Sequence, residues 1–187
     1  MSEIYEAPHN IPDGFEYFDS EEELQRALDR IAPYVGRVII ELNSLESAID
    51  FATKEITSSS EGQDRFIYTF LSKMEFRDKV DVLTSLYGDA VESLGFLDLR
   101  DPLKQLKTRL VTACEKRNTY AHTDWSEIGR NNLVATKYSA NRRGVFRVYR
   151  TFEIEDMEKD IEFIADSSEA LEHFDEMLHD KIHSYKP

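Results

Sequence analysis

The chain has 187 residues, of which 41% are hydrophobic and 32% charged, and its formal net charge is −14. This composition is typical of a soluble globular protein and excludes a fibrous or disordered chain. No run approaches the roughly 18 apolar residues of a membrane-spanning helix, and the first residues lack the basic and apolar regions of a secretory signal. The one cysteine, Cys114, cannot form an internal disulfide. We therefore expect a reduced, cytoplasmic protein.

The charge is unevenly distributed along the chain. The segment 100–150 contains twelve Lys and Arg residues against four Asp and Glu, a local balance of +8. The other residues contain eleven basic and 33 acidic side chains, a balance of −22. Such a protein repels polyanions everywhere except at the basic segment, which is read either as a binding surface or as an ordinary solvated helix and hairpin.

The first part of the chain predicts an arm followed by two helices. Residues 1–19 contain prolines and an Asp-Gly pair, which indicate an extended, turn-rich arm. Ser20 and Glu23 form a capping box at the start of a helix, and Pro33 is expected to end or kink it. A longer helix is predicted over 34–56. Its buried stripe has helical spacing: Val38, Leu42, Leu45, Ile49 and Ala52.

Further helices are predicted after a serine-rich loop at 58–62. One stretch covers 65–87, with a break near Ser72 and a glycine cap at Gly88. The pair Asp101-Pro102 predicts the N-cap and first residue of the next helix. Along that helix an apolar face runs through Leu103, Leu106, Leu110, Val111, Ala113 and Cys114.

The last third of the chain predicts a β-hairpin and a final helix. Two β-prone runs flank the turn signal Asn-Arg-Arg-Gly, which places a hairpin at about 133–152. An acidic helix follows over about 155–183, and a serine pair at 167–168 is a candidate bend. The fold class is therefore mainly α: a helical bundle with a β-hairpin inserted before the C-terminal helix. We expect a single domain over 20–187.

The segment Arg-Asn-Thr-Tyr-Ala-His at 117–122 carries the chemistry of interest. A histidine moves protons near neutral pH, and a guanidinium binds phosphoryl oxygens through two parallel bonds. Arg117 and His122 are therefore candidate catalytic residues for phosphate-ester cleavage, and Asn118 is a candidate partner that orients the imidazole. The alternative is that Arg117 and His122 cap the last carbonyls of a helix.

Helical geometry limits how this site is built. On a regular helix Arg117 and His122 are about 140° apart in projection, whereas Asn118 and His122 share a face. The first two side chains converge only if the helix ends near His122 or if two copies of the chain meet. A symmetric dimer would supply two histidines for acid and base roles. RNA cleavage by attack of the 2′-hydroxyl needs no metal, so no cofactor is expected.

The RNTYAH segment at the end of a late helix, with a tryptophan soon after it, resembles the HEPN superfamily. The preceding helices, including the stretch MEFRDKVDVL, fit the same resemblance, and the sharp match covers about 103–125. The resemblance implies an all-α bundle that dimerises and forms a metal-independent endoribonuclease site from Arg117 and His122. Members that act as nucleotidylated toxins carry a tyrosine two residues after the histidine, and here that residue is Asp124.

The predicted partners follow from this resemblance and from the basic hairpin. RNA is the expected substrate, and four hairpin arginines are candidate contacts with its phosphates: Arg142, Arg143, Arg147 and Arg150. A homodimer is expected, and an antitoxin or an antiviral defence protein is a further candidate partner. The alternative function is a catalytically silent helical module whose acidic surface binds such a partner.

A second histidine pair, His179 and His183, resembles the two-histidine spacing of a zinc-binding helix with aspartate in place of glutamate. It lies in the last helical turns, where histidines also complement the helix dipole. We therefore assign no metal to the sequence.

Overall fold

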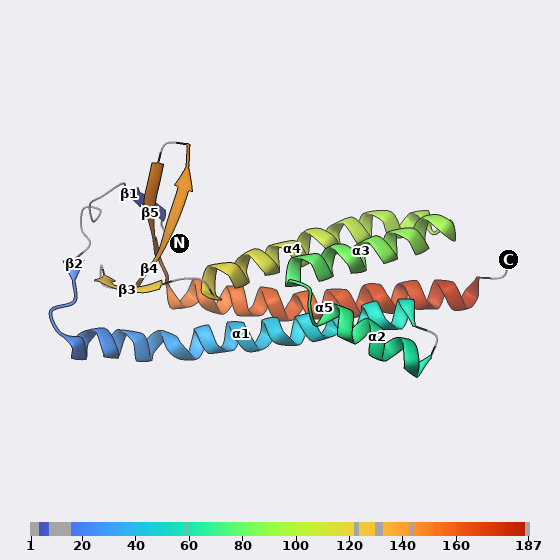
Figure 1. Cartoon of the computed structure of the whole chain (residues 1–187), viewed down its shortest axis with the longest axis horizontal. Coiled ribbons are helices and arrows are strands. Elements are labelled where there is room, and N and C mark those ends of the chain that lie inside the picture. The colour runs from blue at the N-terminus through green and yellow to red at the C-terminus, as the bar shows by residue number, and fades with distance from the viewer. Residues whose placement is uncertain are drawn as a thin grey trace. The chain divides into compact units, whose positions relative to one another are not determined.

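The computed structural model (Figure 1) describes residues 4–7, 16–58, 60–121, 124–129, 133–142 and 144–185. It confirms a mainly α fold with a hairpin before the last helix. The helices are α1 (Glu21–Thr57), α2 (Glu61–Leu71), α3 (Phe76–Ser93), the 3-10 turn η1 (Leu97–Leu99), α4 (Arg100–Ala121) and α5 (Ile154–Ser184). The strands are β1 (Ile4–Ala7), β2 (Glu16–Tyr17), β3 (Asp124–Gly129), β4 (Leu133–Asn141) and β5 (Gly144–Thr151).

The chain divides into two compact units. Unit 1 contains Met1–Ile40 and Arg117–Glu162, and unit 2 contains Glu41–Lys116 and Phe163–Pro187. The boundaries fall within helices α1, α4 and α5. The expected single domain over 20–187 stays a prediction.

Unit 1 contains an antiparallel sheet with the strand order β1-β5-β4-β3-β2. The predicted hairpin is confirmed: β4 pairs with β5, and Asn141 lies opposite Gly144 across a two-residue connection. The described parts of the expected arm at 1–19 are extended, as predicted. They are also paired, because β1 joins β5 and β2 joins β3. These two short strands thus belong to the same sheet as the hairpin.

Helix α1 corrects the prediction of two helices separated at Pro33. The helix runs without interruption from Glu21 to Thr57, with Pro33 inside it. A proline removes one backbone hydrogen bond, and the loss is tolerated here because Ile31 and Val38 on either side are almost completely buried. The first half of the predicted capping box is present: the Glu23 amide donates to Ser20 Oγ at 3.2 Å. The Glu23 carboxylate reaches back one residue further than predicted and accepts from the amide of Asp19 rather than that of Ser20.

The boundaries of α3 and α4 also differ from the prediction. The break near Ser72 is confirmed, but α3 continues through Gly88 to Ser93. The glycine that ends it is Gly95, with φ of 74°, a conformation that favours glycine. The amides of Gly95 and Phe96 bond to the carbonyls of Glu92 and Val91, which is the Schellman pattern. Helix α4 begins at Arg100, so Asp101 lies inside it rather than at its N-cap.

Unit 2 has a core of apolar side chains from α1, α3, α4 and α5. The stripe predicted on α1 is confirmed, with all five of its residues at most 4% exposed; Val38 belongs to unit 1 and the other four to unit 2. The Tyr87 ring packs on Phe174 at 5.1 Å, and its hydroxyl donates to Asp175 Oδ1 at 2.6 Å. Helix α5 runs through its serine pair without a break, and the buried Ser167 hydroxyl donates to the carbonyl of Phe163 within the same helix.

A buried lysine joins α1 to α3 within unit 2. Lys79 Nζ lies 2.7 Å from Glu46 Oε1 and 2.8 Å from Asp50 Oδ2, and only 5% of its side chain is exposed. Burial alone would lower the pKa of Lys79. The hydrogen bonds to Asp50 and Glu46 outweigh burial, so the pKa lies above its ordinary value. The two carboxylates are partly exposed. Both are paired with Lys79, so removal of the lysine would leave two neighbouring negative charges without their cation.

We expect Lys79→Ala to lower the free energy of unfolding by roughly 3 kcal/mol, because it leaves Glu46 and Asp50 unpaired. Urea denaturation at neutral pH measures this change. Lys73→Ala, at an exposed lysine, is the matched control and should change stability by less than about 0.5 kcal/mol. Equal effects of the two substitutions would contradict a structural role for the ion pairs. The contribution of Lys79 should be complete below about pH 10, the unfolded pKa, and should fall as pH rises further.

Candidate functional site at the end of α4

The predicted catalytic segment lies where α4 gives way to the sheet. Helix α4 ends at Ala121 and β3 begins at Asp124, so the chain leaves the helix at the position that the sequence predicts. Arg117 and Asn118 lie in the last turns of α4, whereas His122 lies outside the described residues. The convergence of Arg117 and His122 therefore stays a prediction.

Tyr120 fixes the orientation of this helix end. Its side chain is 3% exposed, and its ring lies 5.3 Å from that of Phe152, which in turn lies 5.3 Å from Trp125. The hydroxyl donates to Asp160 Oδ2 on α5 at 2.8 Å. Burial, together with the charge of Asp160, raises the pKa of Tyr120 well above its ordinary value. The tyrosine therefore stays neutral and keeps this hydrogen bond over the whole physiological range.

Arg117 and Asn118 occupy the more open side of the same turn. Arg117 is half-buried and Asn118 is exposed. Neither side chain forms a hydrogen bond or ion pair with the described part of the chain. A buried Tyr120 three residues after Arg117 sets the direction in which both polar side chains leave the helix. The predicted hydrogen bond between Asn118 and His122 involves a residue outside the description and stays a prediction.

Arg150 of β5 reaches the same turn of α4. Its Nη1 donates to Thr119 Oγ1 at 3.2 Å, and its guanidinium carbon lies 5.8 Å from the centre of the Phe152 ring. Thr119 lies between Asn118 and Tyr120 in the sequence, so the fold brings a hairpin arginine to the candidate catalytic segment. Sequence reasoning predicted Arg150 only as a phosphate contact of the hairpin. It missed Thr119 and Asp160, for which the pattern gives no signal.

The other hairpin arginines differ in their exposure and in the contacts they make. Arg142 is exposed in the two-residue connection, and Arg143 lies outside the described residues. The Arg147 guanidinium lies over the ring of Tyr149 at 5.4 Å and donates to Thr136 Oγ1 at 3.4 Å. Tyr149 is 3% exposed, so it is a core residue rather than an open stacking surface. Arg142 is thus the described hairpin arginine most accessible to a ligand, and Arg147 is partly occupied by packing.

The C-terminal histidines do not form a metal centre with the described residues. His179 Nδ1 lies 3.1 Å from the carbonyl oxygen of Asp175 and 3.4 Å from its carboxylate. The rings of His179 and His183 are 6.3 Å apart. Within the described ranges no group of three or more His, Cys, Asp or Glu side chains converges on a common point.

Comparison with protein families, curated proteins and solved structures finds no match to this chain. Membership of the HEPN superfamily therefore stays a prediction from the residues at 103–125. In the described part of the chain, no helix combines the length and apolar character needed to span a membrane.

We expect Tyr120→Phe to reduce the free energy of unfolding by about 1 kcal/mol, because it removes one hydrogen bond and keeps the ring. Tyr120→Ala should cost roughly 3 kcal/mol, because it also empties the space beside Phe152. Chemical denaturation of the two variants separates the hydrogen bond from the packing. Equal losses in the two variants would contradict a packing role for the ring.

Proposed function

We propose that the protein is a metal-independent endoribonuclease of the HEPN type, with a composite active site formed by two copies of the chain. The observation that carries the proposal is that Arg117 and Asn118 lie in the last turns of α4, at a helix end that the buried Tyr120 anchors to Asp160. A guanidinium such as that of Arg117 suits a phosphodiester with a charged transition state. His122 follows this turn directly and is the one residue of the segment that exchanges a proton near pH 7.

The proposed reaction is cleavage of RNA by attack of the ribose 2′-hydroxyl on the adjacent phosphate. One His122 removes the hydroxyl proton, and the His122 of the second copy protonates the departing 5′-oxygen. Arg117 stabilises the negative charge that gathers on the phosphoryl oxygens. Asn118 holds the imidazole in the tautomer needed for proton transfer. Each chain supplies one His122, so a dimer provides the acid and the base that one chain lacks.

The first test is cleavage of single-stranded RNA in the presence of EDTA. We expect the wild-type chain to cleave and His122→Ala to lose at least a hundredfold in rate, because it lacks the proton-transfer group. Arg117→Ala should lose activity to a similar degree. His183→Ala is the matched control for loss of a histidine and should cleave normally. Unchanged cleavage in His122→Ala, or inhibition of the wild type by EDTA, would contradict the proposal.

The second test addresses the composite site. If two copies form the site, the specific activity should fall as the enzyme is diluted below the dissociation constant of the dimer. Sedimentation velocity at the same concentrations should show the dimer fraction falling in parallel with activity. A specific activity that stays constant while the dimer dissociates would show that one chain carries a complete site.

The alternative function is a catalytically silent helical module that binds a basic partner, such as a protein of a toxin-antitoxin or defence system. The charge of −22 outside residues 100–150 favours this reading. A purified chain that remains monomeric and cleaves no RNA under any of the conditions above would support the alternative.

A further inference from the structure

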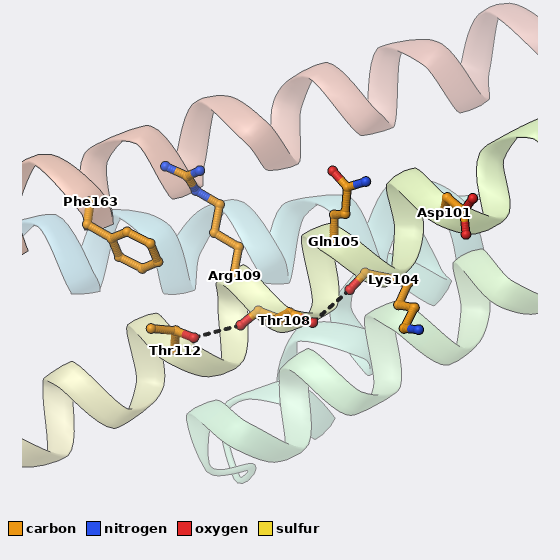
Figure 2. A pocket seen from close by; sticks show the side chains of 7 residues that line it. All are labelled: Asp101, Lys104, Gln105, Thr108, Arg109, Thr112 and Phe163. Atoms are coloured by element: carbon orange, nitrogen blue, oxygen red, sulfur yellow. Dashed lines mark hydrogen bonds between the residues drawn. The ribbon is translucent and has the colours of Figure 1, made fainter.

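An open pocket with a volume of about 540 Å³ lies along one face of α4 in unit 2, separate in sequence from the candidate catalytic segment. Its lining side chains follow helical spacing from Asp101 through Lys104 and Thr108 to Thr112, and Phe163 of α5 lies at one end (Figure 2). Pockets of this size are typical of small-ligand sites. No sequence motif indicates this pocket, and the proposed cleavage reaction does not use it.

An aromatic ring and an arginine are held together at this end of the pocket. The guanidinium carbon of Arg109 lies 4.9 Å from the centre of the Phe163 ring, and the ammonium of Lys116 lies 5.2 Å from it. Arg109 is itself fixed, because its Nε donates to Ser167 Oγ and its Nη2 to Asp166 Oδ2, each at 3.2 Å. Figure 2 shows Phe163 reaching from α5 toward α4 and Arg109 reaching toward α5. Stacking groups that are already positioned lose little entropy when a ligand binds.

The rest of the pocket adds a cation and hydroxyl groups. Lys104 is exposed, and its ammonium forms no ion pair with the described residues. The hydroxyls of Thr108 and Thr112 donate to the carbonyls of Lys104 and Thr108. Their lone pairs can still accept hydrogen bonds from a ligand. Asp101 lies at the opposite end from Phe163, where its carboxylate repels phosphate groups.

We propose that this pocket binds a short segment of single-stranded RNA, with one base against the Phe163 and Arg109 pair and phosphates of the segment near Lys104 and Lys116. Aromatic rings beside cations bind bases of any sequence, because every base has a π-face. A strand fits better than a free nucleotide, because Lys104 and Lys116 are separated by about 18 Å of helical rise. One phosphate group cannot contact both. The proposal rests on the proposed ribonuclease function for the identity of the polymer.

The test measures RNA binding in the absence of cleavage. The full chain carrying His122→Ala is titrated against a labelled single-stranded oligonucleotide of about 12 nucleotides, and fluorescence anisotropy gives the dissociation constant. Phe163→Leu in this background should weaken binding about tenfold, because one base loses its stacking contact with the ring. Phe66→Leu, at a phenylalanine that is 75% exposed on α2 and does not line the pocket, is the matched control and should bind normally.

The salt dependence of binding gives a second, independent readout. Lys104→Gln should reduce the slope of log K against log salt concentration by about 0.7, which corresponds to one phosphate contact. Lys73→Gln removes the same charge at an exposed site outside the pocket and should leave the slope unchanged. Lys104 is exposed, so its replacement tests the pocket even if Phe163→Leu affects folding.

Each outcome separates this proposal from the proposed cleavage function. Wild-type affinity in Phe163→Leu together with an unchanged slope in Lys104→Gln would overturn the pocket, whether or not the wild-type chain cleaves RNA. Adenosine monophosphate that binds as tightly as the oligonucleotide would overturn the assignment to a strand. Binding that depends on Phe163 and Lys104 in a chain that never cleaves RNA would support the pocket and contradict the ribonuclease.

Discussion

The proposed active site depends on the way Tyr120 holds the last turn of α4. A helix end that merely meets solvent frays, and its polar side chains sample many directions. Here the ring of Tyr120 packs on Phe152, and its hydroxyl donates to Asp160. Because Arg117 and Asn118 precede this anchor by three and two residues, their directions follow from its position. Arg150 reaches the same turn because Thr119 accepts its hydrogen bond.

A buried tyrosine that donates a hydrogen bond to an aspartate of α5 occurs in each of the two compact units. In unit 1 the hydroxyl of Tyr120 donates to Asp160, and in unit 2 that of Tyr87 donates to Asp175. Both acceptors belong to α5, and in both cases the ring is buried against a phenylalanine. A buried hydroxyl that lacks its acceptor costs free energy, because it loses its hydrogen bonds to water and gains none from the protein. Each tyrosine–aspartate pair therefore favours one position of its helix against α5. Lys79 acts similarly, because its ammonium requires both Glu46 and Asp50.

The sequence predicted the helices of this fold through periodicity and the hairpin through its turn residues. It was wrong where tertiary packing overrides a local signal. Pro33 predicts a helix end, yet buried residues on either side keep α1 continuous. Gly88 and Gly95 are both glycines that could end a helix. Only Gly95 has the positive φ that favours glycine, so the helix ends there and not at Gly88.

Contacts between distant segments were beyond sequence reasoning. No pattern within 1–19 tells which strands its short extended pieces will join, because the partners lie more than a hundred residues away. For the same reason the sequence does not predict that Arg150 contacts Thr119 or that Arg109 lies against Phe163. The chemical residue types of the candidate site were therefore predictable, whereas their supporting partners were not.

The charge distribution limits the form that the proposed RNA binding can take. At physiological salt the attraction of Lys and Arg side chains for RNA is largely screened beyond a Debye length of about 8 Å, and the acidic remainder of the chain opposes long-range attraction. A strand held by phosphate contacts alone would therefore bind weakly and dissociate as salt rises. An aromatic contact is insensitive to salt, so the Phe163 and Arg109 pair would carry a share of affinity that the basic side chains cannot. In the proposed binding mode these terms would favour short, accessible, unpaired segments of RNA over duplexes, whose stacked bases cannot reach the ring.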